Sequence, residues 1–132
     1  MIAFDTNVLV RLLVGDDPAQ FAAAAALLDA AGEGAETCYL ADVVLCETEW
    51  VLTSRYGARR PDVLAALTEI AADGRYAFED PEAVADALRA YAAGRADFSD
   101  YLIGARSRTK GARTTYTFDG KLKNREGFTY LD

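Results

Sequence analysis

The chain opens with Ile2-Ala3-Phe4-Asp5-Thr6-Asn7-Val8-Leu9, and this stretch decides the fold class that the sequence predicts. The apolar triplet before Asp5 is typical of a short buried strand, and the apolar residues after Asn7 recur at helical spacing. A strand that passes directly into a helix is the first half of a βα unit. Asp5 therefore stands at the carboxyl end of a strand.

The same alternation continues along the chain. Each Asp-Pro pair, at Asp17-Pro18 and Asp80-Pro81, predicts a helix with aspartate as its cap and proline in its first turn. Further strands are predicted at 37–40, 76–78, 114–118 and 128–131, and further helices at 18–31, 42–56, 61–73 and 100–110, the last capped by Ser99. Strands alternating with helices predict one α/β domain, residues 1–132, with a mainly parallel sheet covered on both faces.

The composition excludes several kinds of chemistry. The 132 residues contain no histidine, which removes Ser-His-Asp and Cys-His catalysis and histidine-containing zinc sites. Cys38 and Cys46 cannot form a four-thiolate cage, and their apolar surroundings indicate small core residues in a reducing compartment. Any catalysis must therefore depend on carboxylates.

Charge is unevenly distributed. The net charge is −7, but residues 101–132 hold seven basic and three acidic side chains, so this end of the chain is suited to a polyanion. No segment approaches the roughly 18 apolar residues of a membrane span. The start lacks the basic region and long apolar core of a signal peptide. We expect a cytoplasmic protein with no membrane partner.

Carboxylates stand where strands end or helices begin: Asp5, the pair Asp97 and Asp100, and Asp119. Each also has a purely structural interpretation. Asp5 and Asp100 suit the first turn of a helix, and Asp119-Gly120 is a hairpin turn signal that would pair 114–118 with 121–123. Since the carboxyl ends of parallel strands form sites, the functional interpretation remains open beside the structural one.

A fifth carboxylate lies inside the helix predicted at 42–56. Helical spacing places Glu47 between Val43 and Trp50, in an apolar arc where an unpaired charge is costly. Glu49 also lies on a partly apolar arc, so periodicity does not separate the two glutamates. If these carboxylates converge, their repulsion requires a divalent cation, and an oxygen-only ligand set favours Mg²⁺ or Mn²⁺.

Four blocks carry a family resemblance. They are Asp5 to Leu13 followed by Asp16-Asp17-Pro18, Leu45 to Leu52, Ala96 to Ile103, and Thr115 to Asp119. In this order they resemble the acidic blocks of PIN-domain ribonucleases of the VapC toxin type, over essentially the whole chain. The resemblance implies a three-layer α/β/α sandwich with a central sheet of four or five strands. It also implies Mg²⁺- or Mn²⁺-dependent RNA cleavage, a VapB-type antitoxin partner and a homodimer.

The resemblance also assigns residues. It selects Glu47 over Glu49, and it matches Asp100 better than Asp97 to the general third position. The implied metal ligands and catalytic residues are Asp5 and Asp100 first, completed by Glu47, Asp97 and Asp119. Asn7, Thr117 and Arg11 are candidates to orient ligands or RNA, and the segment 106–113 is a candidate RNA contact.

Two other functions remain possible interpretations of the same sequence. A catalytically silent PIN-like binding module would retain the fold without cleavage. An aspartate phosphotransfer domain would need a phosphate-pairing lysine at a strand end, whereas Lys110, Lys121 and Lys123 all come late. The apolar residues of the helices after Pro18 and Pro61 are predicted to be mostly core, with some in a dimer face or an antitoxin groove. These are Phe21, Leu27, Leu28, Leu64 and Leu67.

Overall fold

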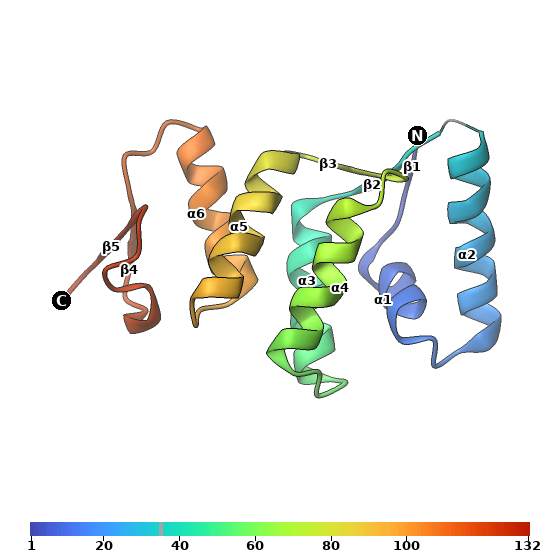
Figure 1. Cartoon of the computed structure of the whole chain (residues 1–132), viewed down its shortest axis with the longest axis horizontal. Coiled ribbons are helices and arrows are strands. Elements are labelled where there is room, and N and C mark those ends of the chain that lie inside the picture. The colour runs from blue at the N-terminus through green and yellow to red at the C-terminus, as the bar shows by residue number, and fades with distance from the viewer. Residues whose placement is uncertain (35) are drawn as a thin grey trace. The chain divides into compact units, whose positions relative to one another are not determined.

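The computed structural model describes residues 1–34 and 36–132 and has an α/β architecture (Figure 1). Its helices are α1 (Thr6–Val14), α2 (Pro18–Glu33), α3 (Asp42–Ser54), α4 (Arg60–Ala72), α5 (Pro81–Ala93), α6 (Phe98–Thr109) and the short 3-10 helix η1 (Gly120–Leu122). Its strands are β1 (Ile2–Ala3), β2 (Cys38–Leu40), β3 (Tyr76–Phe78), β4 (Thr115–Thr117) and β5 (Phe128–Tyr130). The α/β class is confirmed.

The chain divides into two compact units, a first unit of Met1–Glu79 and a second unit of Asp80–Asp132. In the first unit, the strands pair in parallel in the order β1-β2-β3. Helix α1 packs against α2 and α3, and α3 packs against α4. In the second unit, β4 pairs in parallel with β5, and α5 packs against α6. Parallel pairing is therefore confirmed wherever the described strands meet.

Both Asp-Pro signals begin helices as predicted. Asp17 accepts a hydrogen bond from the backbone N–H of Gln20 at 3.1 Å, and Asp80 accepts one from Ala83 at 3.1 Å. Each bond satisfies one of the N–H groups that a helix leaves unpaired in its first turn. The sequence signal and the cap geometry agree at α2 and α5.

The predicted cap of α6 is wrong. The helix begins at Phe98 with Asp97 at the cap position, two residues before the predicted start and ahead of Ser99. Asp100, in the third helical position, accepts the backbone N–H of Asp97 at 3.1 Å. This reciprocal use of an acid three residues into the helix fixes the earlier start.

The core of the first unit centres on the parallel strands. Cys38 and Leu40 on β2 are fully buried, together with Leu9 of α1 and Leu45 of α3. Cys38 and Cys46 are both free thiols, and burial raises the pKa of the Cys38 thiol. Cys38 is thus the small core residue that the sequence predicts, whereas Cys46 is only half-buried.

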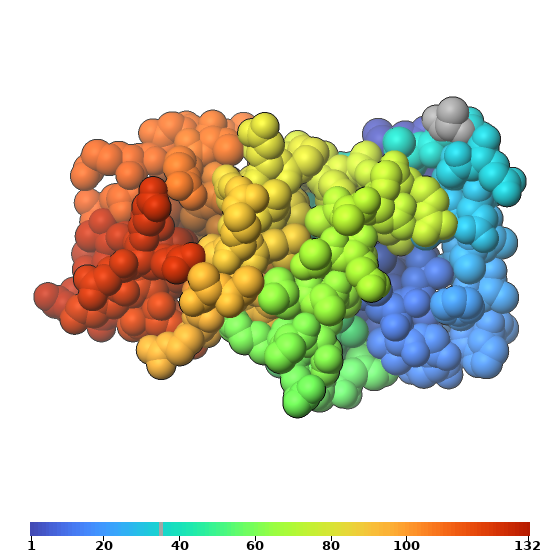
Figure 2. Space-filling model, viewed as in Figure 1, coloured from blue at the N-terminus to red at the C-terminus, as the bar shows by residue number. Residues whose placement is uncertain are grey.

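The helix after Pro18 is only partly core. Leu28 is buried, but Phe21 and Leu27 are exposed, and α2 forms an outer surface of the first unit (Figure 2). On α4, Leu67 is buried and Leu64 is half-buried. No helix among the described residues is both long and apolar enough to cross a membrane.

Close packing of α6 on β5 depends on a glycine. A Cβ atom at Gly104 would lie 2.5 Å from the ring of Phe128, so no larger residue fits without displacing that ring. At the other end of α6, which begins at Phe98, the ring of Phe98 meets Tyr91 of α5 edge-on at 6.3 Å between centroids. These aromatic contacts hold α5, α6 and β5 together.

Arg75, in the loop between α4 and β3, forms two ion pairs. Arg75 Nη2 lies 2.7 Å from Asp73 Oδ2, and Arg75 Nη1 lies 3.0 Å from Asp29 Oδ1 on α2. The side-chain hydrogen bond from Arg75 lowers the pKa of Asp73. These ion pairs therefore join α2 to the loop between α4 and β3.

We predict that Asp73→Asn lowers the free energy of unfolding by about 1 kcal/mol at neutral pH, because it removes a bidentate, half-buried ion pair. Since the folded state depresses the pKa of Asp73, its contribution is full above the unfolded value of about 3.9 and disappears as the pH falls through the folded value. Urea unfolding at neutral and acid pH measures both effects.

The matched control is Asp62→Asn, which removes an exposed pair whose atoms lie 3.6 Å apart and should change stability little. A difference between wild type and Asp73→Asn that stays constant down to about pH 2 would contradict the prediction.

Candidate functional site

Asp5 lies where β1 gives way to α1. Its Oδ1 accepts the backbone N–H of Val8 at 3.0 Å, so the structural interpretation as a helix cap is correct. The side chain is exposed, and its second oxygen has no hydrogen bond within the described part of the chain. Capping thus fixes the carboxylate at the helix N-terminus and leaves one oxygen for a ligand.

Glu47 is tied to the residue next to Asp5. The hydroxyl of Thr6 donates to Glu47 Oε1 at 3.0 Å, although the two residues are 41 positions apart. This bond brings the second acidic block, on α3, to the N-terminus of α1. In the first unit, the structure therefore places the first and second acidic blocks side by side.

The predicted environment of Glu47 is wrong. Glu47 is exposed, as are its neighbours Val43 and Trp50, each at 61%. The buried carboxylate is Glu49, with 6% of its surface exposed. The desolvation argument therefore applies to Glu49, because the face of α3 that contains Val44, Thr48 and Glu49, and not the Val43–Trp50 side, packs into the unit.

Asp97, Asp100 and Asp119 belong to the second unit and interact electrostatically. Asp100 is half-buried and accepts the backbone N–H of Asp97. Burial raises the pKa of Asp100, and the negative charges of Asp97 and Asp119 raise it further. The third and fourth acidic blocks thus lie within electrostatic reach of each other.

Asp119 is held at the end of β4 by its neighbours. Its own N–H donates to Thr117 Oγ1 at 3.0 Å, and its Oδ1 accepts the N–H of Lys121 at 2.9 Å. Lys121 Nζ lies 3.8 Å from Asp119 Oδ2. The hairpin alternative is wrong, since Lys121 belongs to η1 and the partner of β4 is the parallel strand β5.

Arg11 has structural partners. Its Nε donates to Gln20 Oε1 at 2.6 Å, and its Nη1 donates to Asp16 at 3.2 Å and to Tyr56 at 3.0 Å. Tyr56 in turn donates to Asp16 at 2.9 Å. These bonds fasten the ends of α1 and α3 to the start of α2. Asn7 is exposed beside this network.

The basic side chains of the segment 106–113 differ in exposure. Arg106 is half-buried and pairs with Asp80 at 3.3 Å, which ties α6 to the start of α5. Arg108, Lys110 and Arg113 are exposed. The exposed three are the ones available to a polyanion.

Three contributors to this site had no sequence signal or only a weak one. Thr6 was visible only as a possible cap residue, but its hydroxyl orients Glu47. Tyr56, 45 residues from Arg11, could not be linked to it by any local pattern. Gln20 lies one turn into α2, where an amide is unremarkable.

The donor chemistry fits a hard divalent cation, because every candidate ligand is a carboxylate. Asp5 and Glu47 belong to the first unit, and Asp97, Asp100 and Asp119 belong to the second. Within residues 1–34 and 36–132, no group of three or more His, Cys, Asp or Glu side chains is arranged to hold a metal ion. The structure thus divides the candidate ligands between the two units.

Comparison with known proteins identifies one family. The model of the PIN domain matches residues 2–127, which run through both units. The α/β architecture, with helices and parallel strands, is consistent with the three-layer PIN-like sandwich. No curated protein and no solved structure matches the chain.

Tyr101 supports the turn that leads into Asp97. Its buried hydroxyl accepts the N–H of Ala96 at 3.1 Å, and a Cβ atom at Gly94 would lie 1.9 Å from the same oxygen. We predict that Tyr101→Phe lowers the free energy of unfolding by about 1–3 kcal/mol, because the buried N–H of Ala96 loses its acceptor. Thermal or urea unfolding measures the loss.

Tyr116→Phe is the matched control, since Tyr116 is largely exposed and the same oxygen is removed there. Equal stability of the two variants would show that the Ala96 bond contributes nothing.

Proposed function

Because this chain belongs to the PIN domain family, whose members are in general metal-dependent nucleases, we propose that it is a Mg²⁺- or Mn²⁺-dependent endoribonuclease. The observation that supports this most directly is the set of Asp97, Asp100 and Asp119, where burial and like charge raise the pKa of Asp100. A bound cation would relieve the repulsion among these carboxylates. We further propose that residues 1–132 act as a single PIN domain.

The proposed metal ligands are the five acidic residues of the four blocks. Asp5 and Asp100 are the first choice, and Glu47, Asp97 and Asp119 complete the acidic site. When bound, a divalent cation would neutralise charge on the phosphodiester and lower the pKa of an attacking water molecule. No histidine is required as a base, in agreement with its absence from the sequence.

Hydrogen bonds within the chain orient several of the proposed ligands. Thr6 orients Glu47 through its hydroxyl, and the backbone of Asp97 orients Asp100. Thr117 accepts the N–H of Asp119 and so fixes the end of β4. Asn7, with its exposed amide, is proposed to contact RNA or water near Asp5. Arg11 is proposed to act mainly by holding α1 and α2 in place.

Water is the proposed nucleophile, and the products should therefore carry a 5′-phosphate and a 3′-hydroxyl. Attack by the ribose 2′-hydroxyl would instead leave a cyclic phosphate. The exposed cations Arg108, Lys110 and Arg113 are proposed to contact the RNA backbone.

We also propose that the protein is the toxin of a VapBC-type pair, restrained by a VapB-type antitoxin and acting as a homodimer. The support is the order of the four acidic blocks and the family match over residues 2–127. A catalytically silent PIN-like module is the main alternative, and the activity tests below separate the two.

We predict cleavage of structured RNA by the purified protein with Mg²⁺ or Mn²⁺, and its loss in excess EDTA. Asp5→Asn should reduce the rate by about 100-fold or more, because it removes a first-choice ligand while retaining an oxygen that can cap α1. Gel electrophoresis of end-labelled RNA measures the rate and identifies the product ends.

Asp62→Asn, an exposed substitution of the same type on α4, should cleave at the wild-type rate. Cleavage that persists in EDTA or in Asp5→Asn would remove the metal mechanism. A folded wild-type protein that binds RNA without cutting it would favour the silent module.

For the toxin assignment, we predict that expression of the wild-type chain alone arrests bacterial growth and that Asp5→Asn does not. Arrest requires catalysis, so the inactive variant separates toxicity from the burden of expression. Normal growth of cells that contain soluble, active wild-type protein would contradict the assignment.

A further inference from the structure

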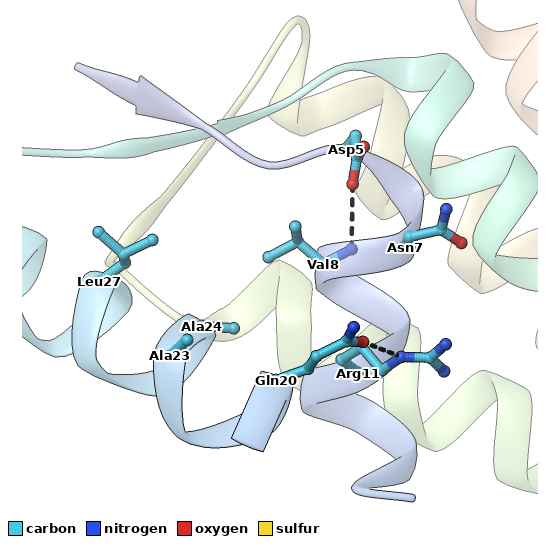
Figure 3. A pocket seen from close by; sticks show the side chains of 8 residues that line it. All are labelled: Asp5, Asn7, Val8, Arg11, Gln20, Ala23, Ala24 and Leu27. Carbon is cyan, nitrogen blue, oxygen red and sulfur yellow. Dashed lines mark hydrogen bonds between the residues drawn. The ribbon is translucent and has the colours of Figure 1, made fainter. Parts of the chain in front are cut away.

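A pocket of about 300 Å³ lies between α1 and α2, entirely within the first unit (Figure 3). Asp5 lines one part of it and Arg11 another. Ala23 and Leu27 of α2 form an apolar side opposite Val8 of α1. Its size is at the lower end of the range for small-ligand sites, which run from about 300 to 1,000 Å³.

The amide of Gln20 has a fixed orientation in this pocket. A guanidinium has only donors, so the 2.6 Å contact with Arg11 Nε must be made by the oxygen of Gln20. The nitrogen of Gln20 is therefore turned away from Arg11 (Figure 3). No hydrogen bond from this nitrogen occurs within the described part of the chain, so Gln20 presents both of its N–H donors while its oxygen is turned toward Arg11.

The lining indicates which part of an RNA nucleotide the pocket takes. Val8, Ala23, Ala24 and Leu27 are apolar, so a phosphate between them would lose hydration that these side chains do not replace. A neutral base has no such penalty, and its flat face can pack against Leu27 and Ala23. Protein recognition of RNA sequence uses such unpaired bases, read at their hydrogen-bonding edges.

We propose that this pocket binds an unpaired base next to the scissile phosphate and that Gln20 determines which base is accepted. This inference rests on the proposed nuclease function, because Asp5 links the pocket to the reaction. With its oxygen held toward Arg11 and its nitrogen directed away, Gln20 favours the carbonyl edges of guanine and uracil over the amino groups of adenine and cytosine. Arg11 is the positioning residue that fixes the direction of the Gln20 amide.

The test is the cleavage of a random-sequence RNA pool, with the ends of the products sequenced. The wild type should show a preference of about tenfold for guanine or uracil at one position beside the cut. Gln20→Glu keeps an oxygen for Arg11 Nε but replaces the free donors with an acceptor. It should therefore shift the preference toward adenine and cytosine.

Two further variants complete the design. Gln20→Leu removes the donors without adding charge, so its preference should disappear without reversing. Ala22→Glu adds the same charge as Gln20→Glu at an exposed position of α2 that does not line the pocket, and it should keep the wild-type preference.

The outcomes separate this inference from the function on which it rests. Cleavage by the wild type with the same base preference in Gln20→Glu and Gln20→Leu, or with no preference in any protein, would overturn the base pocket and leave the nuclease intact. That result would assign the space between α1 and α2 to another occupant, such as a protein partner. Absence of any cleavage by the wild type would overturn both.

Discussion

Parallel strand pairing is the constraint on which the rest of this structure depends. Because β1, β2 and β3 run in the same direction, the chain must return through helices between them, and β1 and β2 pass almost directly into α1 and α3. The carboxyl end of such a strand is therefore also the N-terminus of a helix. Polar side chains at these junctions meet unpaired backbone N–H groups, which bind negative charge.

An acidic residue that precedes a helix can combine two roles. Asp5, Asp97 and Asp119 each precede a helix, and Asp5 and Asp119 accept backbone N–H groups that would otherwise be unsatisfied. The same bonds hold the carboxylates in one orientation. Thr6 extends this order to Glu47 on a different helix. A structural cap and a metal ligand are thus compatible roles for one side chain, and finding the first does not exclude the second.

The sequence predicted the elements well because its signals were local. Asp17-Pro18 and Asp80-Pro81 start helices through contacts within four residues, and the strand at 76–78 was predicted with its observed bounds. Prediction from the sequence failed where tertiary packing determines which side chains are buried and where a helix begins. Periodicity could not show that Glu49, and not Glu47, faces the interior, or that Asp100 moves the start of α6 back to Phe98. The network from Arg11 to Tyr56 spans 45 residues and had no local signal.

The central claim is that the acidic residues of the four blocks serve a divalent cation, and the Mn²⁺ affinity of single variants tests it most directly. Asp5→Asn and Asp100→Asn should each weaken Mn²⁺ binding by about 10–100-fold. Wild-type protein that binds no Mn²⁺, or variants Asp5→Asn and Asp100→Asn that bind it with wild-type affinity, would contradict the account.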